Sequence, residues 1–273
     1  MDFTTANDLI EKVEKSIQRT GSFKKSQPLL VGVDLGTAYI VLVVLDAAMN
    51  PVACEMQFAQ VLKDGLVVDY IGACSIVREL KTKLEKRLGV ELMKAAIAVP
   101  PGTGEGDCKT HQYVVEGSGM EVTGILDEPT AANAVLGIKN GVIVDIGGGT
   151  TGLSILKNGQ VIYTADEPTG GTHLSLVIAG NYGISFEEAE AIKKSKDRQK
   201  EIFTIVRPVI QKMASIVKGH IAEHNVEDIY LVGGTCCLEN IEKVIETETG
   251  IRTHKPNNPF LVTPLGIAMN CKA

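Results

Sequence analysis

The sequence predicts an α/β protein that consists of two duplicated lobes with a cleft between them. Two observations lead to this prediction. Strand hairpins followed by helices occur twice along the chain, which is typical of two α/β halves. Residues 29–45 also resemble residues 141–156, because each segment has an apolar strand, Asp-x-Gly, a threonine and a second apolar strand. With 273 residues, the chain is long enough for two medium-sized cores.

The first lobe is expected to span residues 28–141 and to begin with three strands. Apolar runs and helical periodicity distinguish its elements. We expect strands at residues 29–33, 40–45, 52–58 and 95–99, and helices at 72–88 and 108–118.

The second lobe is expected to span residues 142–273, with a small upper part formed by helices between residues 174 and 224. Asn158-Gly159 is typical of a two-residue hairpin turn. The last helix is expected to pack back toward the first lobe. The other elements that we expect are strands at residues 142–145, 153–157, 160–164 and 229–232, and helices at 238–249 and 264–271.

Residues 1–27 differ from the rest of the chain. Leu9, Ile10, Val13 and Ile17 recur at helical spacing, which predicts an amphipathic helix followed by a polar linker. Two alternatives remain for its apolar face. The helix folds back onto the body of the protein, or it serves as a short docking helix for a partner.

The composition excludes several classes of protein. No apolar run reaches the length of about 18 residues that a membrane-spanning helix requires, and the charged N-terminal segment is not expected to be a signal peptide. The net charge of −6 argues against a nucleic-acid partner. The six cysteines form no CxxC pair, which favours free thiols in the reducing cytoplasm.

The two Asp-x-Gly hairpins carry the clearest chemical signal. Asp34 and Asp145 each end a predicted buried strand, where a carboxylate is costly unless a partner compensates it. Hydrated Mg²⁺ is such a partner, and the glycines that follow allow backbone N–H groups to approach phosphates. Each hairpin alone could be an ordinary turn in which Asp bonds to the backbone. Two of them with the same flanks favour a polyphosphate site that also holds magnesium.

Three further segments could contribute to this site. Glu128 directly precedes Pro129, so we expect it on an extended segment that enters a helix. The loop Gly170-Gly171-Thr172 precedes a helix expected near His173, and a helix N-terminus favours anions. Each of these segments alone is a weak signal, as is Gly233-Gly234-Thr235 after its predicted strand.

Taken together, these segments resemble the actin/Hsp70/hexokinase ATPase superfamily and occur in its order. The resemblance implies an actin-like ATPase (ribonuclease H-like) fold with a nucleotide cleft between the lobes. Lys63 to Tyr70, and Tyr182-Gly183-Ile184 with Glu190 and Lys193, are similar to the branch that includes MreB, FtsA and PilM. The motifs that resemble phosphate-1, connecting, phosphate-2, adenosine and closing motifs begin at Asp34, Glu128, Asp145, Val232 and Pro264.

One family is more similar still, the ethanolamine-utilization chaperone-like EutJ family. Its resemblance rests on five segments. They are residues 32–37, 98–103, 126–131, 165–171 and 261–265. This resemblance implies an ATP-binding chaperone-like or assembly factor for ethanolamine utilization, located in the cytoplasm and associated with a bacterial microcompartment. Its implied partners are ethanolamine-degrading enzymes or shell proteins, and self-association is a further option.

The resemblance also implies a role for each matching residue. Asp34 and Asp145 would hold Mg²⁺ through water, and Glu128 would orient or deprotonate the attacking water. The residues implied to bind the phosphates of ATP or ADP are Gly36, Thr37, Ala38, Gly147, Gly148, Gly149, Thr150, Thr151, Gly170, Gly171 and Thr172. Those implied to surround the nucleoside are Glu190, Lys193, Gly233, Gly234 and Thr235.

Alternative functions remain open at this point. The chain shows no counterpart of the lysine that assists hydrolysis in Hsp70 and no segment for a peptide-binding domain. Hydrolysis is therefore expected to be slow, with conformation as the output. An actin-like scaffold or filament protein that binds nucleotide without significant turnover is the main alternative. A sugar or acetate kinase is a third, although such chains are usually longer.

Overall fold

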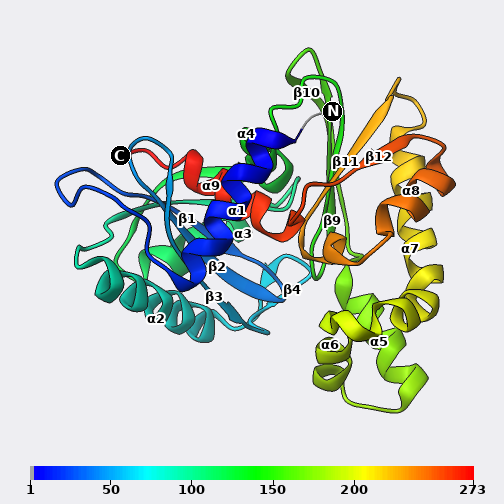
Figure 1. Cartoon of the computed structure of the whole chain (residues 1–273), viewed down its shortest axis with the longest axis horizontal. Helices are drawn as coiled ribbons and strands as arrows, with labels where there is room; N and C mark the ends of the chain where they lie inside the picture. Colours follow the sequence, from blue (N-terminus) through cyan, green and yellow to red (C-terminus); the bar gives the residue numbers. More distant parts are fainter. Residues whose placement is uncertain (1–2) are drawn as a thin grey trace.

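A computed structural model describes residues 3–273 and contains two α/β lobes that face each other (Figure 1). Each lobe is built on a five-stranded sheet, and the two sheets have the same topology. Their strand orders are β3-β2-β1-β6-β7 and β10-β9-β8-β11-β12. In each sheet the first three strands pair antiparallel and the last two pair parallel. The predicted α/β fold with two duplicated lobes is confirmed.

The first lobe covers one face of its sheet with two helices, and a two-stranded ribbon projects near the cleft. Its sheet strands are β1 (Leu30–Leu35), β2 (Tyr39–Leu45), β3 (Pro51–Phe58), β6 (Lys94–Val99) and β7 (Glu121–Asp127). The ribbon is β4 (Leu62–Lys63) with β5 (Leu66–Val67), and the helices are α2 (Tyr70–Leu88), α3 (Glu105–Glu116) and α4 (Glu128–Leu136).

The second lobe carries a helical upper part between its third and fourth strands. Its strands are β8 (Gly141–Ile146), β9 (Thr151–Lys157), β10 (Gln160–Glu167), β11 (Asp228–Val232) and β12 (Arg252–His254). Its helices are α5 (Gly171–Tyr182), α6 (Phe186–Lys194), α7 (Gln199–Ile221), α8 (Ile241–Thr249) and α9 (Val262–Met269), with short 3₁₀ turns η1 (Lys196–Arg198), η2 (Gly234–Cys237) and η3 (Pro259–Leu261).

The alternation of side chains along β1 and β8 decides where the two aspartates point. Val31 and Val33 face the core beneath α2, so the neighbouring Asp34 lies on the opposite face of the sheet. Val144 faces the core beneath α7, which places Asp145 on the other face of the second sheet. Both carboxylates therefore lie on the inner faces, where the two lobes meet.

Helices α4 and α9 form the layer between the two sheets, and glycines allow their close approach. A Cβ atom on Gly266 of α9 would lie 1.8 Å from the carbonyl oxygen of Ala131 in α4. A Cβ atom on Gly32 of β1 would lie 2.4 Å from the backbone nitrogen of Ala268. The backbone of α9 is therefore packed directly against α4 on one side and against β1 on the other, without intervening side chains.

The N-terminal helix α1 (Thr4–Gln18) packs against β3 of the first lobe and also contacts α9 and η3 (Figure 1). Its Ile10 and Val13 are fully buried in the central core. At its C-terminal end, the Arg87 side chain donates to the Ser16 carbonyl at 2.8 Å. At its N-terminal end, Asn7 accepts from the Asn257 backbone at 2.9 Å. The apolar face is therefore folded back onto the body, which is the first of the two alternatives expected from the sequence.

Truncation of the buried face of α1 is expected to destabilise the protein. Ile10→Ala should lower the free energy of unfolding by about 2–4 kcal/mol, because it removes apolar surface and leaves a cavity. Lys12→Ala, on the exposed face of the same helix, should change it by less than about 0.5 kcal/mol. Urea denaturation measures both. Equal stability of the two variants would mean that α1 is detached from the body in solution.

Four strands and one site residue differ from the sequence predictions. Strands β4, β5, β7 and β12 were not predicted, since two are only two residues long and β7 carries no continuous apolar run. The extended segment predicted for Glu128 is wrong. Asp127 caps α4 by accepting from the Thr130 backbone at 2.8 Å, so Glu128 is already the first helical residue.

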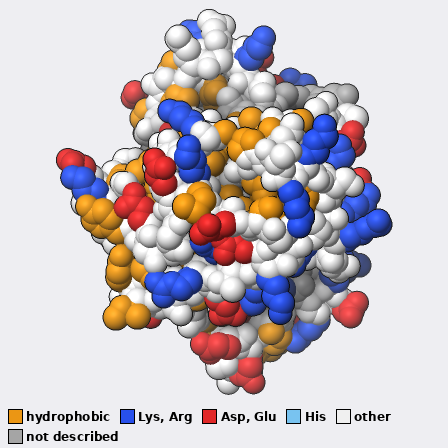
Figure 2. Space-filling view, turned by 90° about the vertical axis from the view of Figure 1, so that its left-hand side faces the viewer, with side chains coloured by type: hydrophobic (Ala, Val, Ile, Leu, Met, Phe, Trp, Pro, Cys, Tyr) orange, Lys and Arg blue, Asp and Glu red, His pale blue; other side chains and the backbone are white. Residues whose placement is uncertain are grey.

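Charges of both signs are interspersed on the surface of the first-lobe side. Figure 2 shows Lys and Arg side chains next to Asp and Glu side chains over this face, with hydrophobic side chains in its upper centre and along its left edge. Among residues 3–273, no helix is both long and apolar enough to cross a membrane.

Candidate nucleotide site

The two Asp-x-Gly hairpins form equivalent turns. In the first, the Gly36 backbone N–H donates to the Tyr39 carbonyl at 3.0 Å. In the second, the Gly147 N–H donates to the Thr150 carbonyl at 3.0 Å. The repeat found in the sequence is therefore a repeat of backbone geometry as well.

The tips of the two hairpins face each other closely enough to need glycine. A Cβ atom on Gly148 would lie 3.1 Å from the Ala38 Cβ atom. A Cβ atom on Gly149 would lie 2.6 Å from the Thr37 hydroxyl oxygen and 2.9 Å from the Asp64 backbone. The second hairpin thus contacts the first through glycine backbone that carries no side chains. This arrangement is expected for two hairpins that bind phosphates between them.

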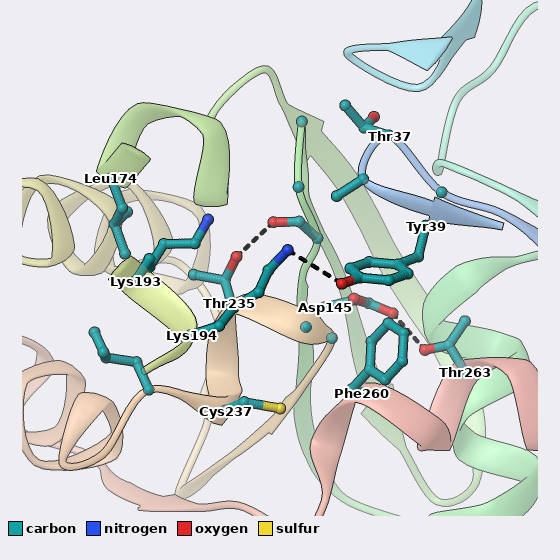
Figure 3. A pocket seen from close by; sticks show the side chains of 18 of the residues that line it. Thr37, Tyr39, Asp145, Leu174, Lys193, Lys194, Thr235, Cys237, Phe260 and Thr263 are labelled. Atoms are coloured by element: carbon teal, nitrogen blue, oxygen red, sulfur yellow. Dashed lines mark hydrogen bonds between the residues drawn. The ribbon is translucent and has the colours of Figure 1, made fainter. Parts of the chain in front are cut away.

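A cavity of about 560 Å³ opens beside these tips, between the lobes (Figure 3). Its volume is within the range usual for small-molecule sites, about 300–1,000 Å³. Most residues that were predicted for the site line it. They are Asp34, Gly36, Thr37, Ala38, Glu128, Asp145, Gly147, Gly148, Gly149, Thr150, Glu190, Lys193, Gly233, Gly234 and Thr235.

Four predicted residues lie behind the second hairpin and not on the cavity wall. The N–H groups of Gly171 and Thr172 donate to the carbonyls of Gly147 and Gly148, at 3.0 and 2.8 Å. The Thr151 hydroxyl donates to the Thr169 carbonyl at 2.6 Å. Gly170, the fourth of them, would place a Cβ atom 2.7 Å from the Gly148 carbonyl oxygen. These residues brace the hairpin, and their direct contact with phosphate stays a prediction.

Three carboxylates, those of Asp34, Glu128 and Asp145, line the floor of the cavity, and a fourth lies close enough to interact with them electrostatically. Burial, followed by the charge of Asp145, raises the pKa of Asp34 to about 7. Burial raises the pKa of Asp145 to about 6, although the Thr263 hydroxyl donates to it at 2.5 Å. Burial and then the charges of Asp145 and Asp34 raise the pKa of Glu128 well above its ordinary value. Within the described residues, no Lys or Arg forms an ion pair with these groups.

The fourth carboxylate, Asp166 on β10, was not among the predicted site residues. Burial raises its pKa to about 6, with a further contribution from the charge of Asp145. Its Oδ1 atom is buried and has no hydrogen-bond partner among the described residues. The signal in the sequence was the segment Ala165-Asp166-Glu167, which carried part of the family resemblance without a role for Asp166.

These residues fit a hydrated divalent cation. Four carboxylates of raised pKa and one unpartnered oxygen form a site that a cation would stabilise. Among residues 3–273, no three His, Cys, Asp or Glu side chains are arranged to hold a metal directly. Mg²⁺ usually keeps several water ligands and takes only one or two carboxylates together with phosphates. The donor set therefore suits Mg²⁺ bound through water.

The opposite end of the cavity is built by α6 and the turn after β11. Lys193 and Glu190 form an ion pair, and the Lys193 ammonium also donates to the Ser175 hydroxyl at 2.8 Å. The Thr235 hydroxyl donates to the Gly147 carbonyl at 2.7 Å (Figure 3). Thr235 thereby links the predicted nucleoside end of the cavity to the second hairpin.

Gly233 permits a particularly close approach. Its φ of +90° is in the region that favours glycine. A Cβ atom at this position would lie 2.3 Å from the Asp145 carboxylate. The turn after β11 and the end of β8 can meet only because this residue has no side chain.

Other lining residues were missed by sequence reasoning because they come from separate elements with no shared motif. Tyr39, Lys194, Cys237, Phe260 and Thr263 belong to this group. Only two had a signal in the sequence. Lys194 follows the predicted Lys193, and Thr263 precedes the closing motif.

Comparison with known proteins gives two levels of similarity. The sequence profile of the MreB/Mbl protein family matches residues 2–194, and that of the type IV pilus assembly protein PilM matches residues 126–268. The ethanolamine utilization protein EutJ of Salmonella typhimurium is 43% identical over 247 residues, which is 90% of this chain and 87% of that protein.

Solved structures agree with the sequence comparison. The crystal structure of EutJ from Carboxydothermus hydrogenoformans has a TM-score of 0.92 and 48% identity, over 98% of this chain and 99% of that one. MreB5 of Spiroplasma citri, solved with bound ADP, has a TM-score of 0.70 and 18% identity, over 90% of this chain and 96% of that one. This second similarity concerns the fold alone.

Proposed function

Since this chain belongs to the EutJ family of ethanolamine utilization proteins, within the actin-like superfamily close to MreB and PilM, we propose that it binds Mg-ATP between its lobes. In this proposal it hydrolyses ATP slowly and acts as a chaperone-like or assembly factor for ethanolamine utilization. The output is the change in lobe closure that accompanies binding and hydrolysis, as in other hinged nucleotide-binding proteins.

The observation that carries the proposal is the pairing of two glycine hairpins above an uncompensated acidic floor. The hairpin tips approach so closely that a Cβ atom on Gly149 would clash with Thr37 and Asp64, and one on Gly148 would crowd Ala38. Asp34 and Asp145 lie directly below them on the inner faces of the two sheets. Phosphate groups alone would be repelled by these carboxylates, so the site favours a polyphosphate together with a cation.

Titration calorimetry tests the binding step. We expect ATP and ADP to bind with Mg²⁺ present and to bind at least about 100-fold more weakly in excess EDTA. AMP, which lacks the phosphates that both hairpins would contact, should bind more weakly than ADP. Absence of heat with Mg-ATP and Mg-ADP, over concentrations up to 1 mM, would overturn the proposed function.

Glu128 is proposed to accept a proton from the attacking water or to orient it. Glu128→Gln should lower the rate of ATP turnover by about 100-fold or more, with the Kd for Mg-ATP changed by less than about threefold. Glu91→Gln, on an exposed loop, is the matched control and should behave as wild type. Phosphate release at saturating ATP measures turnover. Equal rates of phosphate release for wild type and Glu128→Gln would show that Glu128 takes no part in hydrolysis.

The proposed partners are ethanolamine-degrading enzymes or microcompartment shell proteins, which would place the protein in the cytoplasm at the microcompartment. The support is family membership alone. Gel filtration with purified enzyme or shell protein, in ATP and in ADP, tests this proposal. Sedimentation with Mg-ATP distinguishes it from the actin-like scaffold, because only a filament would pellet without a partner.

A further inference from the structure

Lys194 lines the nucleotide cavity, and its side chain is 42% exposed, which places it at the rim. It is the last residue of α6 in the upper part of the second lobe, and its ammonium donates to the Tyr39 hydroxyl of the first lobe at 3.1 Å (Figure 3). Tyr39 begins β2, immediately after the first glycine hairpin. The two residues are separated by 155 positions in sequence, so this contact joins the two lobes.

The partner surface for this ammonium is aromatic. The Lys194 nitrogen lies 4.7 Å from the ring centroid of Tyr39 and also 4.7 Å from that of Phe58. Both rings belong to the first lobe, and Phe260 packs edge-on against Tyr39 with a centroid distance of 5.5 Å. An ammonium over aromatic faces within about 6 Å is attracted by the ring quadrupole. The contact is therefore more than one hydrogen bond.

The position of Lys194 is fixed from its own side by a buried carboxylate. Glu190, one turn earlier on α6, is only 5% exposed and forms an ion pair with Lys194 at 2.9 Å. The same carboxylate pairs with Lys193, which holds the N-terminal turn of α5 through the Gly171 carbonyl at 3.0 Å. Lys194 thus extends from a well-anchored helix toward the first lobe. Its contact with Tyr39 can form only when the two lobes are close together.

We propose that Lys194 and Tyr39 form a latch that must open for nucleotide to enter or leave the cavity. This inference rests on the proposed nucleotide site. When the contact breaks, the second lobe, whose helix α6 carries Lys194, would move away from the first lobe. Lys194 and Tyr39 belong to different lobes, which must separate before nucleotide can pass. The latch therefore regulates the rate of nucleotide exchange.

The latch makes a kinetic prediction that differs from a direct ligand role. If the contact exists with and without nucleotide, its loss raises the association and dissociation rates equally and leaves Kd unchanged. If Lys194 instead bound the nucleotide, its loss would raise the dissociation rate and Kd together, with the association rate unaltered. The two rates therefore distinguish a gate from a binding residue.

The test compares Lys194→Met, Tyr39→Phe, the double variant and Lys200→Ala as the control, an exposed lysine on α7 outside the cavity. Binding and release of ³²P-labelled ADP are followed by rapid filtration, so that no fluorescent label perturbs the mouth. Lys194→Met should raise both rates about tenfold, with Kd within about twofold of wild type. Tyr39→Phe keeps the ring and should raise both rates about threefold, and the double variant should equal Lys194→Met.

Several outcomes would overturn the latch. Unchanged rates in Lys194→Met show that the contact does not limit exchange, and a rise in dissociation alone shows that Lys194 is a nucleotide ligand. Additive effects in the double variant show that the two residues act separately. If the wild type binds no ADP at all, the result overturns the proposed nucleotide site itself, and the latch falls with it. Circular dichroism confirms that each variant is folded, and Tyr39→Phe provides the test if Lys194→Met is not.

Discussion

Asp34→Asn should strongly weaken magnesium-dependent ATP binding and at the same time stabilise the nucleotide-free protein. Asp34 lines the cavity floor beside Asp145, and no cation pairs with either carboxylate among the described residues. The substitution removes one of several buried like charges, which should add about 1–2 kcal/mol to the free energy of unfolding. It also removes a group that would hold Mg²⁺, which should weaken Mg-ATP binding by about 100-fold or more.

The two effects are measured separately and have a common control. Thermal unfolding without nucleotide gives the stability, and calorimetry with Mg-ATP gives the affinity. Asp8→Asn carries the same change of charge at an exposed position on α1 and should alter neither quantity. If Asp34→Asn loses both affinity and stability, Asp34 supports the fold. If it keeps wild-type affinity for Mg-ATP, Asp34 does not hold the cation.

The cavity floor could be predicted from sequence because strand alternation and strand ends are local properties. Asp34 and Asp145 lie near the ends of apolar strands whose alternate residues pack beneath helices, so both aspartates are directed toward the interior between the lobes. Glycines after each aspartate then allow backbone contact between the hairpins. The repeat placed these features twice, and the topology of the two sheets brought them face to face.

Other parts of the site depend on tertiary contacts that no local pattern encodes. Asp166 comes close to the acidic floor only because β10 pairs with β9 in a register that sets it opposite Gly152. Lys194 reaches Tyr39 only through the relative position of the lobes. Strand β7 is exposed at a sheet edge and lacks the apolar run of a central strand, so its sequence resembles a loop.

Gly266→Ala should destabilise the whole molecule, because Gly266 lies where α9 crosses α4. The added Cβ atom would lie 1.8 Å from the carbonyl oxygen of Ala131 and 2.5 Å from its carbonyl carbon. Both atoms belong to helix backbone, so relief requires the two helices to separate. We expect a loss of about 3 kcal/mol or more in the free energy of unfolding.

The same substitution should reach the nucleotide site through α4, since Glu128 is the first residue of that helix and Ala131 is one turn further. Any folded fraction of Gly266→Ala should therefore hydrolyse ATP more slowly than wild type at saturating Mg-ATP.

The matched control is Gly219→Ala in α7, where a Cβ atom would meet no heavy atom within 4 Å. Helix propensity alone should there add about 0.5–1 kcal/mol to the free energy of unfolding. Urea denaturation compares the two variants. If Gly266→Ala unfolds at the same urea concentration as wild type, α4 and α9 are further apart in solution, and Glu128 is then positioned by the Asp127 cap alone.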